Sequence, residues 1–146
     1  MAKDVAGVTM GWTLPGVSTK GWKQVSLDTA APLKDRGNDI QPRAVVDGLF
    51  TWYRVEFELP EARKGEWIPW LARVCASGNG YMWLNGHNIG RHWECGPQRD
   101  FFLPECWLNF GEGQKNVLVF GLRQTANGAH LQAIEIRPYE DAAELR

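Results

Sequence analysis

The sequence predicts an all-β fold, a two-sheet β-sandwich with jelly-roll or Greek-key wiring. Its 16 glycines and 8 prolines interrupt the apolar stretches too closely for ordinary helices. Several of these stretches alternate apolar with polar residues, which is typical of a strand with one face in water. About eight such stretches, separated by turn residues, are what a sandwich or barrel of this kind requires.

The individual strands follow from local patterns. Val55, Phe57 and Leu59 alternate with polar residues and predict a strand. Asn85-Gly86 tolerates the two positive φ angles of a type I′ turn, so residues 81–84 and 87–89 are expected to form a tight hairpin. Further strands are expected at residues 22–27, 70–76, 101–103, 116–122 and 131–137. The strand at 116–122 is expected to be central in its sheet, because it is apolar on both faces. Residues 29–48 are expected to form an irregular crossing segment with one helical turn.

Length and charge limit the function. The 146 residues fit a single domain, residues 1–146 with a core of about 20–137, which is large enough to need no disulfide or cofactor. The net charge of −1 creates no one-signed field that would attract nucleic acid. The first residues hold no apolar stretch of signal-peptide length, and no run approaches the length that spans a bilayer. We therefore expect neither nucleic acid nor a membrane as partner. The localisation stays open, and a secreted or periplasmic parent protein is compatible with the sequence.

Catalytic patterns are weak throughout the chain. Glycoside hydrolysis normally needs two carboxylic acids across a cleft, one of them kept protonated by apolar surroundings. Glu56 and Glu58 alternate with core residues and are expected on a solvated face, while Glu94 has no evident partner. We therefore predict that this chain contains no catalytic residues.

Metal and disulfide chemistry are secondary hypotheses. Acids in loops suit a structural calcium ion, although surface acids without a metal are commoner. The pool for such a site is Asp28, Asp35, Asn38, Asp39 and Glu135. Cys75, Cys95 and Cys106 match no zinc pattern and are interpreted as reduced, small apolar residues, with a Cys95–Cys106 disulfide as the alternative.

The most informative segment is residues 90–100, which concentrates one indole with guanidinium, imidazole, carboxylate and amide groups. Because sugars stack on aromatic rings while polar planes bind their hydroxyls, this mixture predicts a carbohydrate contact. In the alternative, Arg91 binds carbonyls and Trp93 fills the end of the core, so that the loop is fastened to the sandwich. The candidate carbohydrate-binding residues, including two from the polar loop 125–130, are Trp93, Arg91, Glu94, Gln98, His92, Arg99, Asn127 and His130.

Residues 81–98, YMWLNGHNIGRHWECGPQ, carry a family resemblance. They resemble the pattern G-x-x-W-x-N-G-x-x-x-G-R-x-W-x-x-G-P-Q of the C-terminal jelly-roll domains of β-galactosidases of glycoside hydrolase family thirty-five. Residues 101–108 and 111–120 are similar to later segments of those domains, and residues 48–57 resemble a strand shared with the sugar-binding domains of family-two glycosidases. The resemblance implies a galactose-binding-like jelly roll that packs beside a TIM-barrel catalytic domain and carries no catalytic glutamate.

We therefore expect a non-catalytic carbohydrate-binding accessory domain of a larger glycoside hydrolase. Its partners would be a galactose-containing or related polysaccharide and the catalytic domain of the parent glycosidase. The alternative is a structural domain that buttresses the catalytic barrel without binding sugar. That alternative predicts exposed tryptophans, such as Trp12, Trp67 or Trp70.

Overall fold

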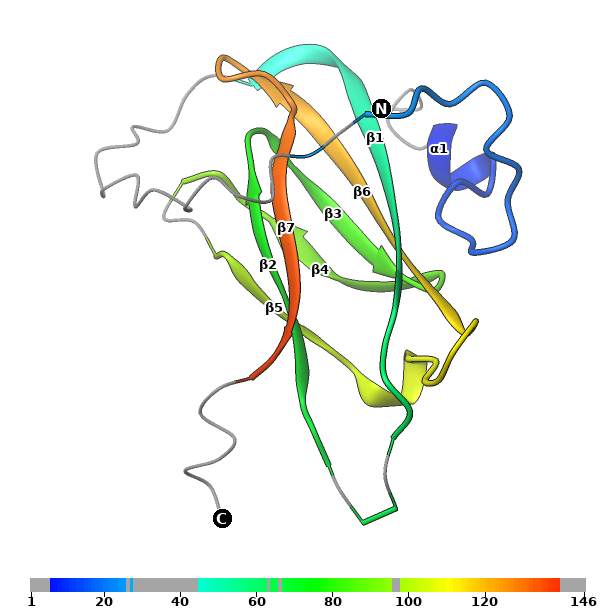
Figure 1. Ribbon diagram of the computed structural model, residues 1–146. Helices are drawn as coiled ribbons and strands as arrows, with labels where there is room; N and C mark the ends of the chain where they lie inside the picture. Colours follow the sequence, from blue (N-terminus) through cyan, green and yellow to red (C-terminus); the bar gives the residue numbers. More distant parts are fainter. Residues whose placement is uncertain are drawn as a thin grey trace.

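The computed structural model describes residues 6–25, 27, 45–62, 64–65, 67–95 and 98–139. Nearly all of the regular secondary structure in this part of the chain is β (Figure 1). None of its helices is long and apolar enough to cross a membrane. The elements are α1 (Ala6–Thr9), β1 (Val45–Glu58), β2 (Trp70–Ala76), β3 (Asn79–Leu84), β4 (His87–His92), β5 (Asp100–Leu103), the 3₁₀ turn η2 (Glu105–Trp107), β6 (Lys115–Thr125) and β7 (Leu131–Pro138).

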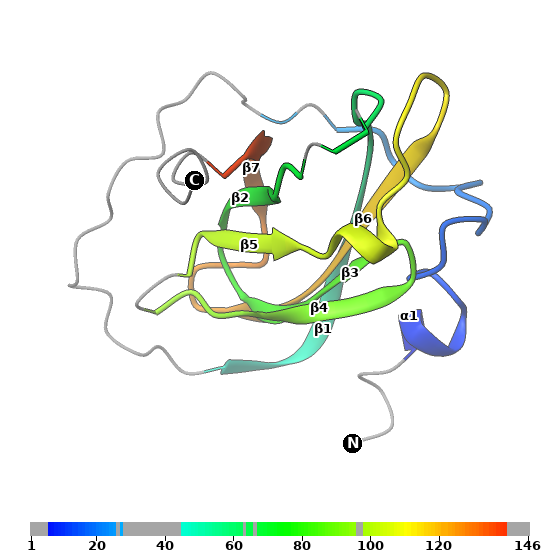
Figure 2. The ribbon, with the colours of Figure 1, turned by 90° about the horizontal axis from the view of Figure 1, so that it is seen from below.

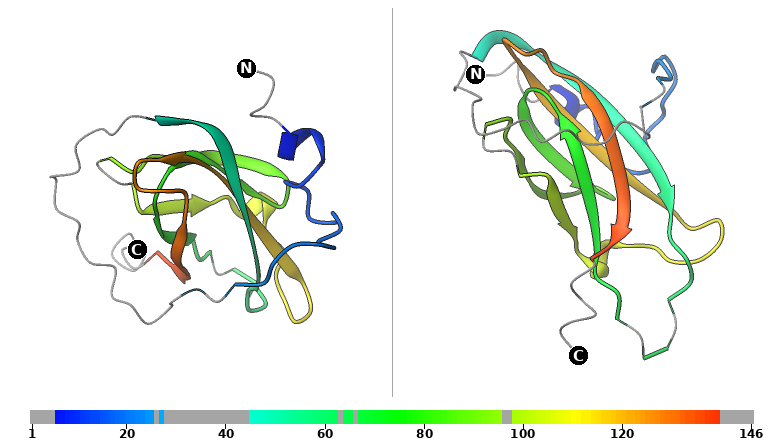
Figure 3. Two further views of the ribbon diagram at one scale, coloured as in Figure 1. Left: turned by 90° about the horizontal axis from the view of Figure 1, so that it is seen from above. Right: turned by 60° about the vertical axis from the view of Figure 1, so that its left-hand side comes forward.

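The strands form two antiparallel sheets, ordered β1-β6-β3-β4 and β5-β2-β7. The sheets lie as two layers with the core between them (Figure 3). Alternate residues of each strand point into this core, as the period-2 pattern predicted. Its fully enclosed side chains include Met82, Leu84, Leu118, Phe120, Ala72, Val74 and Leu103. The two-sheet β-sandwich is thus confirmed, and β6 lies between β1 and β3 as its apolar sequence indicated.

The predicted hairpin between β3 and β4 is also confirmed. Asn85 and Gly86 have φ angles of 48° and 90°, so both adopt the left-handed conformation that the turn requires. At Gly90 a Cβ would meet no atom within 4 Å, but the φ angle is 133°. Backbone conformation, and not lack of room, therefore favours glycine at position 90.

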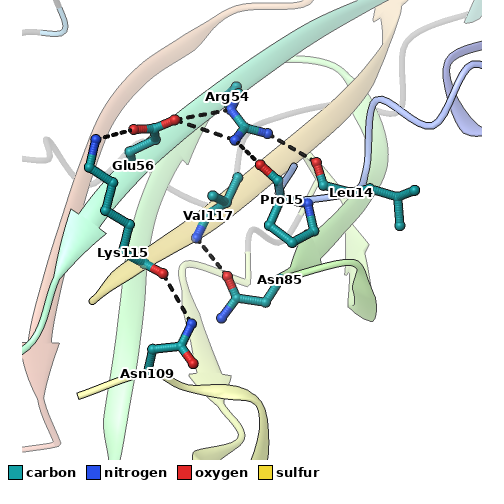
Figure 4. Close-up of polar contacts among 8 residues, drawn as sticks. All are labelled: Leu14, Pro15, Arg54, Glu56, Asn85, Asn109, Lys115 and Val117. Atoms are coloured by element: carbon teal, nitrogen blue, oxygen red, sulfur yellow. Dashed lines mark hydrogen bonds and ion pairs between the residues drawn. The ribbon is translucent and has the colours of Figure 1, made fainter. Parts of the chain in front are cut away.

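Asn85 has a second role that its turn position did not reveal. Its Oδ1 accepts a hydrogen bond from the backbone N–H of Val117 at 2.8 Å, and its Nδ2 donates to the carbonyl of Trp107 at 2.6 Å. Nearby, Asn109 donates from Nδ2 to the carbonyl of Lys115 at 3.0 Å (Figure 4). These bonds fasten the tip of the hairpin to the start of β6.

The N-terminal half departs most from the sequence prediction. The strand expected at residues 22–27 is wrong, because the described residues 21–25 and 27 form no strand. Strand β1 begins at Val45, inside the stretch expected to be irregular, whereas the crossing and helical turn expected over residues 29–44 lie outside the described residues.

The first part of the N-terminal segment, residues 6–25, lies on the outer face of the four-stranded sheet, with α1 on the side that faces away from β5, β2 and β7 (Figure 2). Arg54 of β1 holds this N-terminal segment: its guanidinium donates to the carbonyls of Leu14 at 3.2 Å and Pro15 at 2.5 Å, and also contacts Glu56 (Figure 4). The Arg54 side chain was expected on a wet face but is only 7% exposed. The sequence pattern of β1 could not show that another segment lies over it.

Candidate functional site

A buried carboxylate anchors the loop that follows β4. Glu94 is 5% exposed, and its Oε2 accepts hydrogen bonds from the backbone N–H of Gly78 and from Oγ1 of Thr125, both at 2.9 Å. Its Oε1 accepts from Nδ2 of Asn127 at 3.3 Å. Glu94 therefore ties this loop to the β2–β3 turn and to the end of β6, and its oxygens face protein donors.

His92, at the end of β4, is a second buried anchor. It is 1% exposed, and its Nδ1 lies 3.0 Å from the carbonyl oxygen of Gly78. Because a carbonyl only accepts, Nδ1 carries the proton. Burial lowers the pKa of His92 below its ordinary value, and the Gly78 carbonyl and the Glu94 charge offset this only in part. The imidazole is therefore neutral near pH 7.

Arg91 and Trp93 alternate with these anchors and point out to solvent. The guanidinium carbon of Arg91 lies 4.5 Å from the centre of the Trp93 ring, a cation–π contact, and Trp93 is 41% exposed. Tyr81, directly opposite Arg91 in the β3–β4 pair, is 46% exposed. We call Tyr81, Arg91 and Trp93 the Trp93 ledge.

A row of aromatic rings continues from the ledge across the outer face of the four-stranded sheet. The Tyr81 ring lies 6.3 Å from that of Trp83, which stacks on Trp52 at 5.6 Å. Trp12 of the N-terminal segment meets Trp52 edge-on at 5.8 Å. Gly121 of β6 pairs with both Tyr81 and Trp52, and a Cβ there would lie 3.0 Å from the Trp52 indole. The row ends in solvent at the ledge and under the N-terminal segment at its other end.

The structure divides the predicted loop residues into two groups. The loop is shorter than expected, because β4 continues through His92. In the alternative, Arg91 and Trp93 were expected to fasten the loop to the sandwich. Instead, His92 and Glu94 fasten it. The two residues expected to anchor are the exposed ones.

The remaining predicted residues are spread around this end of the molecule. Gln98 is exposed and donates to the carbonyl of Asp100 at 3.3 Å, and the Arg99 carbonyl accepts from the N–H of Val74 at 2.8 Å. Asn127 is engaged with Glu94, whereas His130 is exposed. Tyr81 was missed, because its place opposite Arg91 depends on a bulge between Met82 and Trp83 that shifts the register by one residue.

The metal and cysteine hypotheses have separate outcomes. Asp28, Asp35, Asn38 and Asp39 lie outside the described residues, and Glu135 is an exposed residue of β7 whose strand partner is Arg73. Among the residues that the structure describes, no group of three or more His, Cys, Asp or Glu could hold a metal ion. Calcium binding stays a prediction. All three cysteines are free thiols, so the Cys95–Cys106 alternative is wrong.

Comparison with known proteins places this geometry in a family context. Residues 50–113, which include the Trp93 ledge, match the family model described as beta-galactosidase, galactose-binding domain. This part of the chain is similar to the galactose-binding domain of β-galactosidases. Beta-galactosidase-1-like protein 2 of Homo sapiens is 43% identical over 56 residues, covering 38% of this chain and 8% of that protein. Beta-galactosidase 14 of Arabidopsis thaliana is 32% identical over 92 residues, covering 58% of this chain and 10% of that protein.

This chain thus spans only about a tenth or less of the length of these relatives. Among solved structures, the apo β-glucuronidase from Ruminococcus gnavus is 25% identical, with a TM-score of 0.37 over 50% of this chain and 12% of that one.

Proposed function

We propose that the chain is a non-catalytic, carbohydrate-contacting accessory domain of a larger glycoside hydrolase, and that its ligand is a galactose-containing or related polysaccharide. The observation that carries the proposal is the Trp93 ledge: an exposed indole with a guanidinium stacked on it, inside the stretch that matches the galactose-binding domain model. Exposed aromatic and cationic groups held in place by buried ones are typical of a binding surface.

The ledge has the chemistry for a sugar contact. The Trp93 and Tyr81 rings offer apolar faces to the C–H groups of a pyranose, and the Arg91 guanidinium offers N–H donors to its hydroxyl oxygens. Because Arg91 lies in β4 and Trp93 lies between the anchors His92 and Glu94, little conformational entropy is lost on binding. The surface is open, so we expect weak binding.

The acids considered for catalysis are engaged in other contacts. Glu94 accepts three hydrogen bonds in a buried site, and Glu58 accepts one from the backbone N–H of Gly113. Hydrogen bonds from Lys115 and Arg54 outweigh partial burial and lower the pKa of Glu56, which favours its ionised form and not that of a general acid. We assign catalysis to another domain of the parent enzyme.

One observation favours the alternative of a buttressing domain. Trp67, in the connection between β1 and β2, is 58% exposed, as that alternative expects. Trp12 and Trp70 are partly buried, and Trp12 packs against Trp22 and Trp52. Of the three tryptophans that the alternative expects to be exposed, only Trp67 is exposed.

Affinity electrophoresis in gels that contain galactans, xyloglucans or pectins tests the proposal. We expect retardation by a galactose-containing glycan, and its loss in Trp93→Ala. The matched control is Phe102→Ala, because Phe102 is an exposed aromatic residue on the other sheet and is 54% exposed. Migration unaffected by every glycan would remove the sugar-binding proposal and favour the buttressing domain.

A further inference from the structure

A cavity of about 320 Å³ is lined by residues of the β1–β2 connection and of the segment around η2. Figure 1 shows that this connection lies at the end of the sandwich away from the loop that follows β4. Its lining combines apolar, aromatic and acidic side chains and consists of Pro60, Glu61, Ala62, Ile68, Trp70, Glu105 and Phe110. This volume is at the lower end of the range typical of small-ligand sites, roughly 300–1,000 Å³, and suits one or two sugar rings.

The walls of the cavity are fixed by backbone hydrogen bonds. The N–H of Gly111 donates to the carbonyl of Leu59 at 3.0 Å, which holds the segment after η2 against the end of β1. The N–H of Leu108 donates to the carbonyl of Glu105 at 3.0 Å and closes the η2 turn. These two bonds brace the side of the cavity formed by the end of β1 and by η2.

The described lining of the cavity is acidic. Its two charged residues are Glu61 and Glu105, and none of the described residues that line it is Lys, Arg or His. No residue in the described part of the chain makes a hydrogen bond or ion pair with either carboxylate. Trp70 and Phe110 add aromatic rings, whose faces also attract cations. The complementary ligand has an apolar body and a positive charge.

We propose that this cavity is a second binding site of the domain and takes an amine-bearing sugar. The sugar ring packs against Trp70, Ile68 and Phe110, while its ammonium group pairs with the carboxylates of Glu61 and Glu105. The proposal rests on the proposed function only in taking carbohydrate as the ligand class. It uses none of the residues of the Trp93 ledge.

Binding, and not hydrolysis, fits the two carboxylates. A glycosidic general acid is kept protonated by apolar burial, whereas Glu61 and Glu105 are both exposed to solvent. Two ionised carboxylates at the edge of an aromatic cavity favour a cationic ligand over a neutral one, because Coulomb attraction and cation–π attraction act together.

The test uses two matched ligands, a glucosamine oligosaccharide and its N-acetylated counterpart, which lacks the positive charge. Titration calorimetry is done at a pH where the amine is protonated and carboxylates are ionised, with the full chain and three variants. The double variant Glu61→Gln/Glu105→Gln removes both charges without shortening either side chain. Glu112→Gln makes the same change at an exposed residue outside the lining, and Trp93→Ala disables the ledge.

We expect the amine form to bind more tightly than the N-acetylated form, and the double variant to weaken it about tenfold or more, as the loss of a charged contact implies. Glu112→Gln should leave its affinity unchanged, and in Trp93→Ala the preference for the amine form over the N-acetylated form should persist. Equal binding of both ligands, full affinity in the double variant, loss of binding in Trp93→Ala, or no binding of the amine form would each overturn the proposal.

Binding of oligolysine without binding of the amine sugar would also overturn it, in favour of a basic protein partner. Retardation by galactans at the ledge is measured separately, so either proposal can fail alone.

Discussion

At the scale of single residues, the candidate site depends on an alternation over four consecutive positions. Arg91 and Trp93 face solvent, while His92 and Glu94 face the sandwich. Residue types alone could not assign these directions, because Trp is the better core residue and Glu the better surface residue. The backbone N–H of Gly78 and the Thr125 hydroxyl, both distant in sequence, satisfy the Glu94 carboxylate and reverse that expectation.

The substitution Glu94→Gln tests the role of this buried carboxylate. An amide cannot accept hydrogen bonds at both of its ends, so at least one of the donors that now contact Glu94 is left without an acceptor. We expect a loss of about 1–3 kcal/mol in the free energy of unfolding, measured by urea denaturation. Glu112→Gln, at an exposed position, should change it by less than about 0.5 kcal/mol. Equal stability of the two variants would show that Glu94 is no anchor.

His92 predicts a pH dependence of stability. Burial lowers its pKa in the folded chain, so between the folded and unfolded pKa values the unfolded chain binds more protons. The stability that neutral His92 provides is therefore complete above the ordinary histidine pKa of about 6.5 and is lost as the pH falls below it. We expect the Tm to fall between neutral pH and about pH 5.

Two variants isolate that effect. His92→Gln should flatten the dependence of Tm on pH, whereas His130→Gln, which changes an exposed histidine, should keep the slope of the unchanged chain. Identical slopes in all three proteins would mean that His92 does not titrate on unfolding.

At the scale of elements, most strands could be predicted because each carries its own pattern. The positions of β2, β5 and β7 and the tight turn at Asn85-Gly86 agree with the sequence within about two residues. The register of β4 against β3 could not be predicted in the same way. A bulge between Met82 and Trp83 moves Arg91 opposite Tyr81, and Gly90, which has a positive φ in the structure, lies beside this bulge.

The N-terminal segment, residues 6–25, could not be placed from sequence, because its position depends on contacts with β1. Arg54 supplies the polar part of these contacts. In Arg54→Ala we expect trypsin to cut several times faster at Lys20 and Lys23, because the segment opens more often when it loses two hydrogen bonds worth roughly 1 kcal/mol or more each.

The control for that experiment is Lys115→Ala, which removes only an exposed contact with Glu56 at 3.2 Å. Cleavage at Lys20 and Lys23 should proceed at the original rate in this variant. An unchanged rate in Arg54→Ala would show that the aromatic contacts of Trp12 suffice to hold the segment.

At the scale of the whole molecule, the two-sheet sandwich was predictable and the distribution of its binding features was not. Period-2 alternation and glycine-rich turns specify a sandwich through local rules. The surplus of aromatic residues did not reveal which rings lie in the core, which form the outer row and which reach solvent. That division is set by the order β1-β6-β3-β4, which brings Trp52, Trp83 and Tyr81 together around Gly121.

The same order places Arg91 of the Trp93 ledge on the edge strand β4, with Tyr81 on the neighbouring β3 and Trp93 directly after β4. The acidic cavity between the β1–β2 connection and η2 lies elsewhere on the sandwich.

The most direct measurement is an NMR titration of the ¹⁵N-labelled chain with a galactose-containing oligosaccharide. The Trp93 ledge predicts that the largest shifts occur at the indole N–H of Trp93 and at the amides of Tyr81 and Arg91, with His92 and Glu94 moving less. Absence of shifts at saturating oligosaccharide, or shifts confined to the opposite sheet, would contradict a sugar contact at this ledge.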